Sequence, residues 1–176
     1  MKKIFLSSLL LISLFFTLLS CHKNDAVAPA PKTFVLVHGA WQAPYVWQAV
    51  KDQLVQQGQN VVVVELPGHG ADNTSPATLS MDVYRDKVIS AINALPEHVI
   101  LVGHSMGGMV ISAVAEKIPS RIDKLVYIGA FLPANGQSLL ALASTDSTSQ
   151  LGPALIPSAD QLTLGIKTEN LTPIFI

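Results

Sequence analysis

The chain alternates short, continuously apolar runs with stretches in which apolar residues recur at helical spacing. Four apolar runs, each bounded by turn residues, predict β-strands: Thr33–Val37, Asn60–Val64, His98–Val102 and Lys124–Ile128. Continuous rather than alternating apolar runs are typical of strands that are covered on both faces. Since helical stretches separate the runs, we expect right-handed crossovers and an α/β fold, a mostly parallel sheet with helices on both faces.

Three apolar stripes predict the helices between these strands. Their members are Trp47, Val50 and Leu54, then Met81, Tyr84, Val88 and Ile92, then Val110, Val114 and Ile118. Gly58 ends the first stripe, Ser80 is placed to cap the second helix, and Pro119 stops the third. Beyond residue 134 the pattern dissolves into Ser, Thr, Gly and Pro with short apolar pieces.

The third apolar run leads into Gly103-His104-Ser105-Met106-Gly107-Gly108, and a helical stretch follows. A serine flanked in this way, between a buried strand and a helix, predicts a sharp turn that lifts its hydroxyl clear of the sheet. Glycines at 103 and 107 remove side chains that would collide in such a turn. Ser105 would then present its Oγ at the positive end of a helix, as a nucleophile does.

Acyl transfer also needs backbone donors for the negative oxygen of the tetrahedral intermediate. The loop after the first strand, His38-Gly39-Ala40-Trp41, is placed to supply one of them. We expect the backbone N–H groups of Ala40 and Met106 to form this oxyanion hole.

Four segments in order resemble the α/β-hydrolase superfamily, nearest to its branch of plant methylesterases, hydroxynitrile lyases and bacterial relatives. They read FVLVHGAW (34–41), LPGHG (66–70), GHSMGG (103–108) and YIGAFLP (127–133). The resemblance spans residues 32–137 and implies that Ser105 is the nucleophile and that Ala40 and Met106 hold the oxyanion. It also implies a substrate pocket bordered by Trp41, with Gly39 and His104, and a lid that begins after residue 133.

The triad of this superfamily runs Ser, then Asp or Glu, then His along the chain. The last histidine here is His104, and none of the later acids, Asp123, Asp146, Asp160 and Glu169, is recognisable as the triad acid. We therefore expect a C-terminally truncated, nearly inactive form of a longer hydrolase. Its strand at 124–128 would then form an unpaired, apolar edge.

The leading hypothesis is hydrolysis of carboxylic esters or related small acyl compounds through an acyl-serine. One alternative is carbon–carbon lyase chemistry of the hydroxynitrile type, and another is a non-catalytic, lipid-tethered binding domain. Dehalogenases and epoxide hydrolases of this fold carry aspartate where Ser105 stands. No dinucleotide fingerprint or zinc motif is present, so we expect neither a cofactor nor a metal.

The N-terminus has the pattern of a secretory signal. Met1-Lys2-Lys3 precedes an uncharged apolar stretch over residues 4–19, which is shorter than the ~20 residues of a membrane-spanning helix. Leu18-Leu19-Ser20-Cys21 resembles a bacterial lipobox, so we expect a signal peptide at 1–20 and lipidation of Cys21. Residues 21–32 would form a tether, 33–133 the hydrolase core, and 134–176 the start of a lid or cap region. The chain would be exported and lipid-anchored in the cell envelope of a bacterium.

Charge and composition limit the classes of molecule that the chain is expected to bind. Only 13% of residues are charged, the net charge is −1, and Lys and Arg are scattered along the chain. This pattern gives no sign of a nucleic-acid partner. The expected partners are a small ester or acyl substrate and a membrane, reached through the lipid anchor. The apolar loop at 43–46 favours a small, hydrophobic acyl group.

Overall fold

The computed structural model describes residues 30–175. The expected signal peptide and Cys21 lie outside these residues. Within them, four parallel strands form one sheet in the order β2-β1-β3-β4, with all neighbouring pairs parallel. The strands are β1 Thr33–Val37, β2 Asn60–Val64, β3 Val99–His104 and β4 Ile122–Ile128. The predicted mostly parallel sheet is therefore confirmed, and the first two strands have the predicted bounds.

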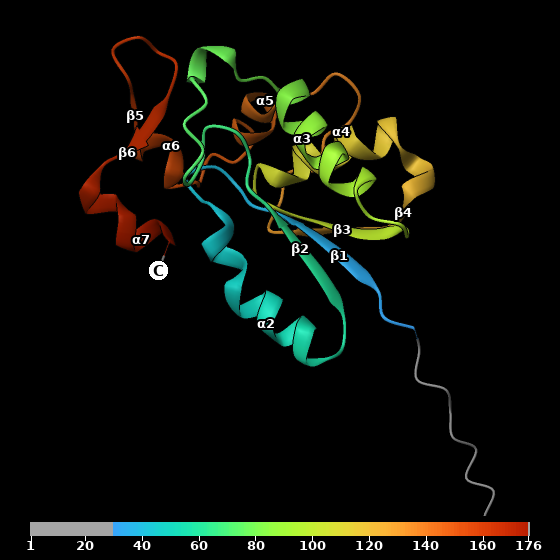
Figure 1. Ribbon diagram of the computed structural model, residues 1–176. Helices are drawn as coiled ribbons and strands as arrows, with labels where there is room; N and C mark the ends of the chain where they lie inside the picture. The colour runs from blue at the N-terminus through green and yellow to red at the C-terminus, as the bar shows by residue number, and fades with distance from the viewer. Residues whose placement is uncertain (1–29, 176) are drawn as a thin grey trace, which may run out of the picture. The chain divides into compact units, whose positions relative to one another are not determined.

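Helices cover both faces of this sheet, as predicted (Figure 1). One face carries the short helix η1 and α2, and the other carries α3 and α4. Their bounds are η1 Pro44–Trp47, α2 Gln48–Gln56, α3 Met81–Asn93 and α4 Gly107–Lys117. The predicted cap is present, because the Ser80 hydroxyl accepts the N–H of Val83 at 3.3 Å. Short 3-10 helices, η2 Pro76–Thr78 and η3 Pro119–Arg121, lead into α3 and β4.

Alternate residues of β1 point into two separate cores, which explains its continuous apolar sequence. Val35 and Val37 pack in the core beneath α3 and α4, while Leu36 packs with Trp47 on the opposite face. The side chains of these three residues are each at most 1% exposed. Burial on both faces is how a sheet sandwiched between helix layers is stabilised.

The fourth strand departs from this pattern. Leu125 and Val126 are each 36% exposed and Ile128 is 45% exposed, so the prediction that this run is covered on both faces is wrong. The reason is position: β4 lies at the edge of the sheet and pairs only with β3 among the described residues. Side chains at an edge have fewer neighbours and keep contact with solvent.

Residues 134–175 fold into short elements that no clear hydrophobic pattern in the sequence predicted. They are α5 Leu139–Ala143, α6 Leu151–Ala154, β5 Leu155–Pro157, β6 Leu164–Ile166, η4 Thr168–Asn170 and α7 Leu171–Phe175. The strands β5 and β6 pair as an antiparallel ribbon. This segment contacts the loop after β1, since the Trp41 indole N–H donates to the backbone oxygen of Leu164. Nowhere between residues 30 and 175 is a helix both long and apolar enough to cross a membrane.

Candidate active site

Ser105 occupies a strained turn between β3 and α4. Its φ is +53°, in the left-handed region that non-glycine residues rarely adopt. Such a conformation costs of order 1–3 kcal/mol and persists only where the surroundings hold it. Here the Ser105 carbonyl accepts the N–H of Gly108 at 3.0 Å and that of Phe131 at 3.1 Å. The strained backbone predicted for this residue is therefore present, and the segment after β4 helps to hold it.

The flanking glycines allow backbone segments to approach the turn closely. A Cβ atom on Gly103 would stand 2.7 Å from the backbone oxygen of Gly107. One on Gly107 would stand 2.7 Å from the backbone oxygen of Val37. Real Cβ atoms do not approach this closely, so the predicted reason for these two glycines is confirmed.

The loop after β1 lies directly against this turn. A Cβ atom on Gly39 would be 2.8 Å from the Cβ of Ser105 and 3.2 Å from the backbone oxygen of His104. The loop also contains a second left-handed residue, Trp41, with φ +56°. Two strained turns, one from each segment, thus meet at the carboxyl edge of the sheet.

Several polar groups at this junction have no hydrogen-bond partner among the described residues. Within residues 30–175, neither the N–H of Ala40 nor that of Met106 donates to a protein acceptor, and the Ser105 hydroxyl has no hydrogen-bond partner. Backbone N–H groups in proteins are almost always paired with protein or water. Two unpaired N–H groups in the segments beside a half-buried serine are an arrangement that suits an oxygen anion.

His38 fixes the loop to the rest of the fold. Its Nδ1–H donates to the carbonyl of Gly39 at 2.9 Å, and its Nε2 accepts the N–H of Leu66 at 3.1 Å. This pairing requires the neutral ring with the proton on Nδ1. Burial lowers the pKa of His38 and so favours the same state. With both nitrogens engaged, His38 is a structural group and not a general base.

Gln42 is the residue of this site that the sequence did not single out. Its side-chain Oε1 accepts the N–H of Gly39 at 3.2 Å and the Nδ1–H of His104 at 2.9 Å. Its backbone oxygen accepts the Nδ1–H of His69 at 3.1 Å. A polar side chain inside an otherwise apolar loop is a weak signal, and the partners lie too far along the sequence for the pattern to reveal them.

The other described histidines are also accounted for. The Nε2 of His69 accepts the Tyr84 hydroxyl at 3.2 Å, and burial raises the pKa of Tyr84. His98 lies 3.3 Å from Asp123 at the opposite end of β3. Burial lowers the pKa of His104. None of the four histidines among the described residues is hydrogen-bonded to the Ser105 hydroxyl.

The later acids are likewise engaged elsewhere or apart from the site. Asp146 accepts from the hydroxyl and N–H of Thr148, which lowers its pKa. Asp160 accepts from Ser158 and Leu162, and these bonds lower its pKa too. Glu169 lies in η4. No cluster of three or more His, Cys, Asp or Glu that could hold a metal occurs in the part of the chain that the structure describes.

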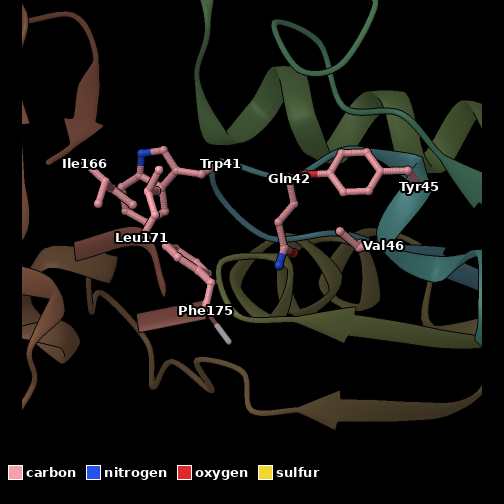
Figure 2. A pocket seen from close by; sticks show the side chains of 7 residues that line it. All are labelled: Trp41, Gln42, Tyr45, Val46, Ile166, Leu171 and Phe175. Carbon is pink, nitrogen blue, oxygen red and sulfur yellow. The ribbon is translucent and has the colours of Figure 1, made fainter. Parts of the chain in front are cut away.

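A pocket of about 430 Å³ adjoins the loop after β1 (Figure 2), and its lining does not include Ser105, Ala40 or Met106. Its lining comes from two parts of the chain that are distant in sequence: the loop after β1 with η1 contributes Trp41, Gln42, Tyr45 and Val46, and the C-terminal segment contributes Ile166, Leu171 and Phe175. The rings of Trp41 and Phe175 meet edge to face at 6.5 Å. Of the predicted pocket residues, Trp41 lines this space. Gly39 and His104 are not among its lining residues, but both are hydrogen-bonded to Gln42, which is.

Comparison with known proteins identifies relatives of the chain. Residues 34–170 match the model of the alpha/beta hydrolase family. A carbendazim hydrolyzing esterase of Nocardioides sp. is 40% identical over 111 residues, covering 62% of this chain and 46% of that protein. An alpha-hydroxynitrile lyase of Arabidopsis thaliana is 40% identical over 103 residues, covering 57% of this chain and 40% of that protein.

Among solved structures, an extracellular alpha/beta-hydrolase from a Paenibacillus species is 34% identical with a TM-score of 0.61. The match covers 73% of this chain and 55% of that one. The chain thus spans about half the length of the relatives that it matches. The family match extends over most of the chain, and the parallel sheet with its strained serine turn agrees with it. The chain belongs to the alpha/beta hydrolase family.

Proposed function

We propose that this chain carries the nucleophile and oxyanion hole of an ester hydrolase, with Ser105 as the residue that forms the acyl-enzyme. The observation that carries the proposal is the junction of two turns: the left-handed Ser105 packed against Gly39. The unpaired N–H groups of Ala40 and Met106 belong to the same two segments. The similarity to an esterase at 40% identity supports this chemistry.

In the proposed reaction the Ser105 oxygen attacks the ester carbonyl carbon while its proton passes to a general base. The carbonyl oxygen becomes an anion, which the N–H groups of Ala40 and Met106 stabilise. Collapse of this intermediate breaks the bond to the alkoxy group, which leaves as the alcohol with the proton. Water then hydrolyses the acyl-serine to the acid and regenerates the serine hydroxyl.

None of the described histidines is placed to act as the general base of this reaction. His38 and His69 each have both nitrogens engaged, and His98 is paired with Asp123. His104 gives its Nδ1–H to Gln42 and has no hydrogen bond to the Ser105 hydroxyl. A serine without a base keeps its proton at neutral pH and is a poor nucleophile. We infer that the 176 residues alone acylate slowly, and that rapid turnover needs a base in addition to these histidines.

The pocket favours a substrate with an uncharged, apolar group next to the reacting carbonyl. Its lining carries no charged side chain and is mostly aromatic and aliphatic. An apolar surface of this kind excludes a carboxylate or ammonium group, because either would lose its hydration without gaining a partner. The substrate class is thus a small hydrophobic ester.

Two measurements test the proposal. A fluorophosphonate probe should label the wild-type chain at Ser105 and leave Ser105→Ala unlabelled. With an activated ester such as p-nitrophenyl acetate, the 176-residue chain should release nitrophenol slowly, without a fast stoichiometric burst. Equal labelling of both variants would refute the role of Ser105. A fast burst would refute the need for a further base, and no labelling of the wild type would favour a non-catalytic binding domain.

A second candidate is cleavage of a cyanohydrin, favoured by the 40% identity to an alpha-hydroxynitrile lyase. Such a reaction breaks a carbon–carbon bond, and no acyl-enzyme forms. Release of cyanide from mandelonitrile, dependent on Ser105 and without a covalent adduct in the mass spectrum, would support this candidate over the ester hydrolase.

We further propose that the chain is exported and anchored in a bacterial envelope through a lipid on Cys21, with residues 21–32 as a tether. Support comes from the sequence alone: a basic start, an apolar core and a lipobox-like ending. Expression in a bacterial host with labelled palmitate should place label on the wild type and none on Cys21→Ser. Labelling of neither protein, with both released in soluble form, would indicate an ordinary signal peptide.

A further inference from the structure

The side chain of Gln42 stands between the nucleophile turn and the pocket. It comes from the loop after β1, directly after the left-handed Trp41. In Figure 2 it lies between two groups of side chains, one formed by Trp41, Leu171 and Phe175 and the other by Tyr45 and Val46. Gln42 lines the pocket, and its side-chain oxygen faces Gly39 and His104.

The orientation of this carboxamide follows from its partners. The backbone N–H of Gly39 can only donate, so the atom that faces it must be the amide oxygen. The same oxygen faces Nδ1 of His104, which must therefore carry the proton. The Nδ1–H tautomer of His104 is thus specified by Gln42.

These two bonds decide which N–H groups remain for a substrate. Gly39 and Ala40 are adjacent, and both N–H groups lie in the loop packed against Ser105. Because Gln42 takes the N–H of Gly39, that group is not available to a substrate, whereas the adjacent N–H of Ala40 has no acceptor among the described residues. The bond to His104 ties the same loop to the residue that immediately precedes the nucleophile.

We propose that Gln42 is a positioning residue: by accepting the N–H of Gly39 and the Nδ1–H of His104 at one oxygen, it holds the oxyanion loop in register with Ser105. The inference rests on the proposed function, since it gives that loop a role in catalysis. Gln42 does not touch the reacting atoms in this account. It acts through the placement of the Ala40 N–H group.

The first test reads the tautomer of His104 by nitrogen-15 NMR and needs no activity. The wild-type chain should show the proton on Nδ1. Gln42→Met, which conserves volume and removes the acceptor, should lose this preference, while Gln42→Glu keeps an acceptor oxygen and should retain it. A wild-type ring protonated on Nε2, or a tautomer unchanged in Gln42→Met, would overturn the proposal.

The second test measures the rate at which a fluorophosphonate probe labels Ser105. Misplacing an oxyanion donor by about 1 Å costs on the order of 10²-fold in rate, so labelling of Gln42→Met should fall by about tenfold to a hundredfold. The matched control is Gln53→Met on the exposed side of α2, which should label at the wild-type rate. Circular dichroism and urea unfolding show whether both variants are folded.

The outcomes separate this inference from the proposed function. Equal labelling rates for wild type and folded Gln42→Met would refute the positioning role while leaving Ser105 as the nucleophile. An unlabelled wild type would refute the proposed function and with it the catalytic role of Gln42. The tautomer measurement would then still decide whether Gln42 holds the loop.

Discussion

Gly39 and Ser105 are in such close contact that a single methyl group added to Gly39 would stand 2.8 Å from the Cβ of Ser105. Sixty-six positions separate these residues in the sequence, and in the fold they bring the loop after β1 and the turn before α4 to one place. The contact leaves little room for adjustment, because the backbone oxygen of His104 also stands 3.2 Å from the same methyl position.

Gly39→Ala should therefore separate the loop from the nucleophile turn. Overpacking of this kind typically costs about 1–3 kcal/mol of unfolding free energy, and labelling of Ser105 by a fluorophosphonate should slow because the Ala40 donor is displaced. Urea unfolding and probe kinetics measure the two effects. Gly152→Ala is the matched control, since no atom lies within 4 Å of an added methyl there. Wild-type stability and labelling in Gly39→Ala would contradict the close contact.

Because the backbone at Ser105 is strained, the two substitutions that remove its hydroxyl should differ in stability. Ser105→Gly and Ser105→Ala both lose the hydroxyl, but only glycine adopts φ +53° without steric cost. We expect Ser105→Gly to be more stable than Ser105→Ala by about 1 kcal/mol. Urea unfolding of the pair gives the difference directly. A glycine variant that is no more stable than the alanine variant would argue against strain at this turn.

His38 predicts a dependence of stability on pH. Burial lowers its pKa in the folded state below that of the unfolded chain, so the unfolded state binds a proton first as the pH falls. The stabilisation is complete above the unfolded pKa of about 6.5 and is lost progressively below it. The urea concentration at the midpoint of unfolding should therefore decrease when the pH is lowered from 7.5 to 5.5.

His38→Gln serves as the comparison for this pH dependence. Glutamine offers an NH₂ donor group and a carbonyl acceptor in place of the ring's N–H and its unprotonated nitrogen, but it does not titrate. Its urea midpoint should change less between the two pH values than that of the wild type. An equal change in both proteins would assign the pH dependence to other groups.

We expect Arg121 to stabilise the C-terminal end of α3. Its guanidinium donates to the carbonyls of Ile92, Leu95 and Glu97 at 3.1, 2.7 and 3.1 Å. A cation at the carbonyl end of a helix satisfies unpaired acceptors and opposes the helix dipole. Arg121→Met should lower the unfolding free energy by about 1–2 kcal/mol. Lys87→Met, at an exposed position in the middle of α3 and away from its carbonyl end, is the control and should change it little.

The exposed edge of the sheet predicts self-association. Among the described residues β4 pairs on one side only, and Leu125, Val126 and Ile128 on it are exposed. A lysine on an edge strand opposes pairing between molecules. Val126→Lys should raise the concentration at which light scattering detects aggregates. The control is Val55→Lys on α2, also an exposed valine, which should leave that concentration unchanged.

Much of the core was predictable because its signals are local. The apolar runs at Thr33–Val37 and Asn60–Val64 predicted the first and last residues of β1 and β2 correctly, and Ser80 predicted where α3 begins. The third strand was one residue out at its start, because His98 precedes the ladder and the strand continues to His104. The serine turn was also predictable, since its glycines and its place between strand and helix lie within a few residues of one another.

By itself, the sequence determined the parallel sheet, the helices on its two faces and the turn that presents Ser105. Apolar periodicity, caps and glycine spacing act over about one element length, and such signals are legible in a single chain. The tertiary structure alone decided what completes the site: the Gln42 bond to His104 across 62 positions and the Trp41 bond to Leu164 across 123. It also decided that residues 166–175 supply part of the pocket lining. Contacts between distant segments depend on how whole elements pack, and no local pattern of residues specifies them.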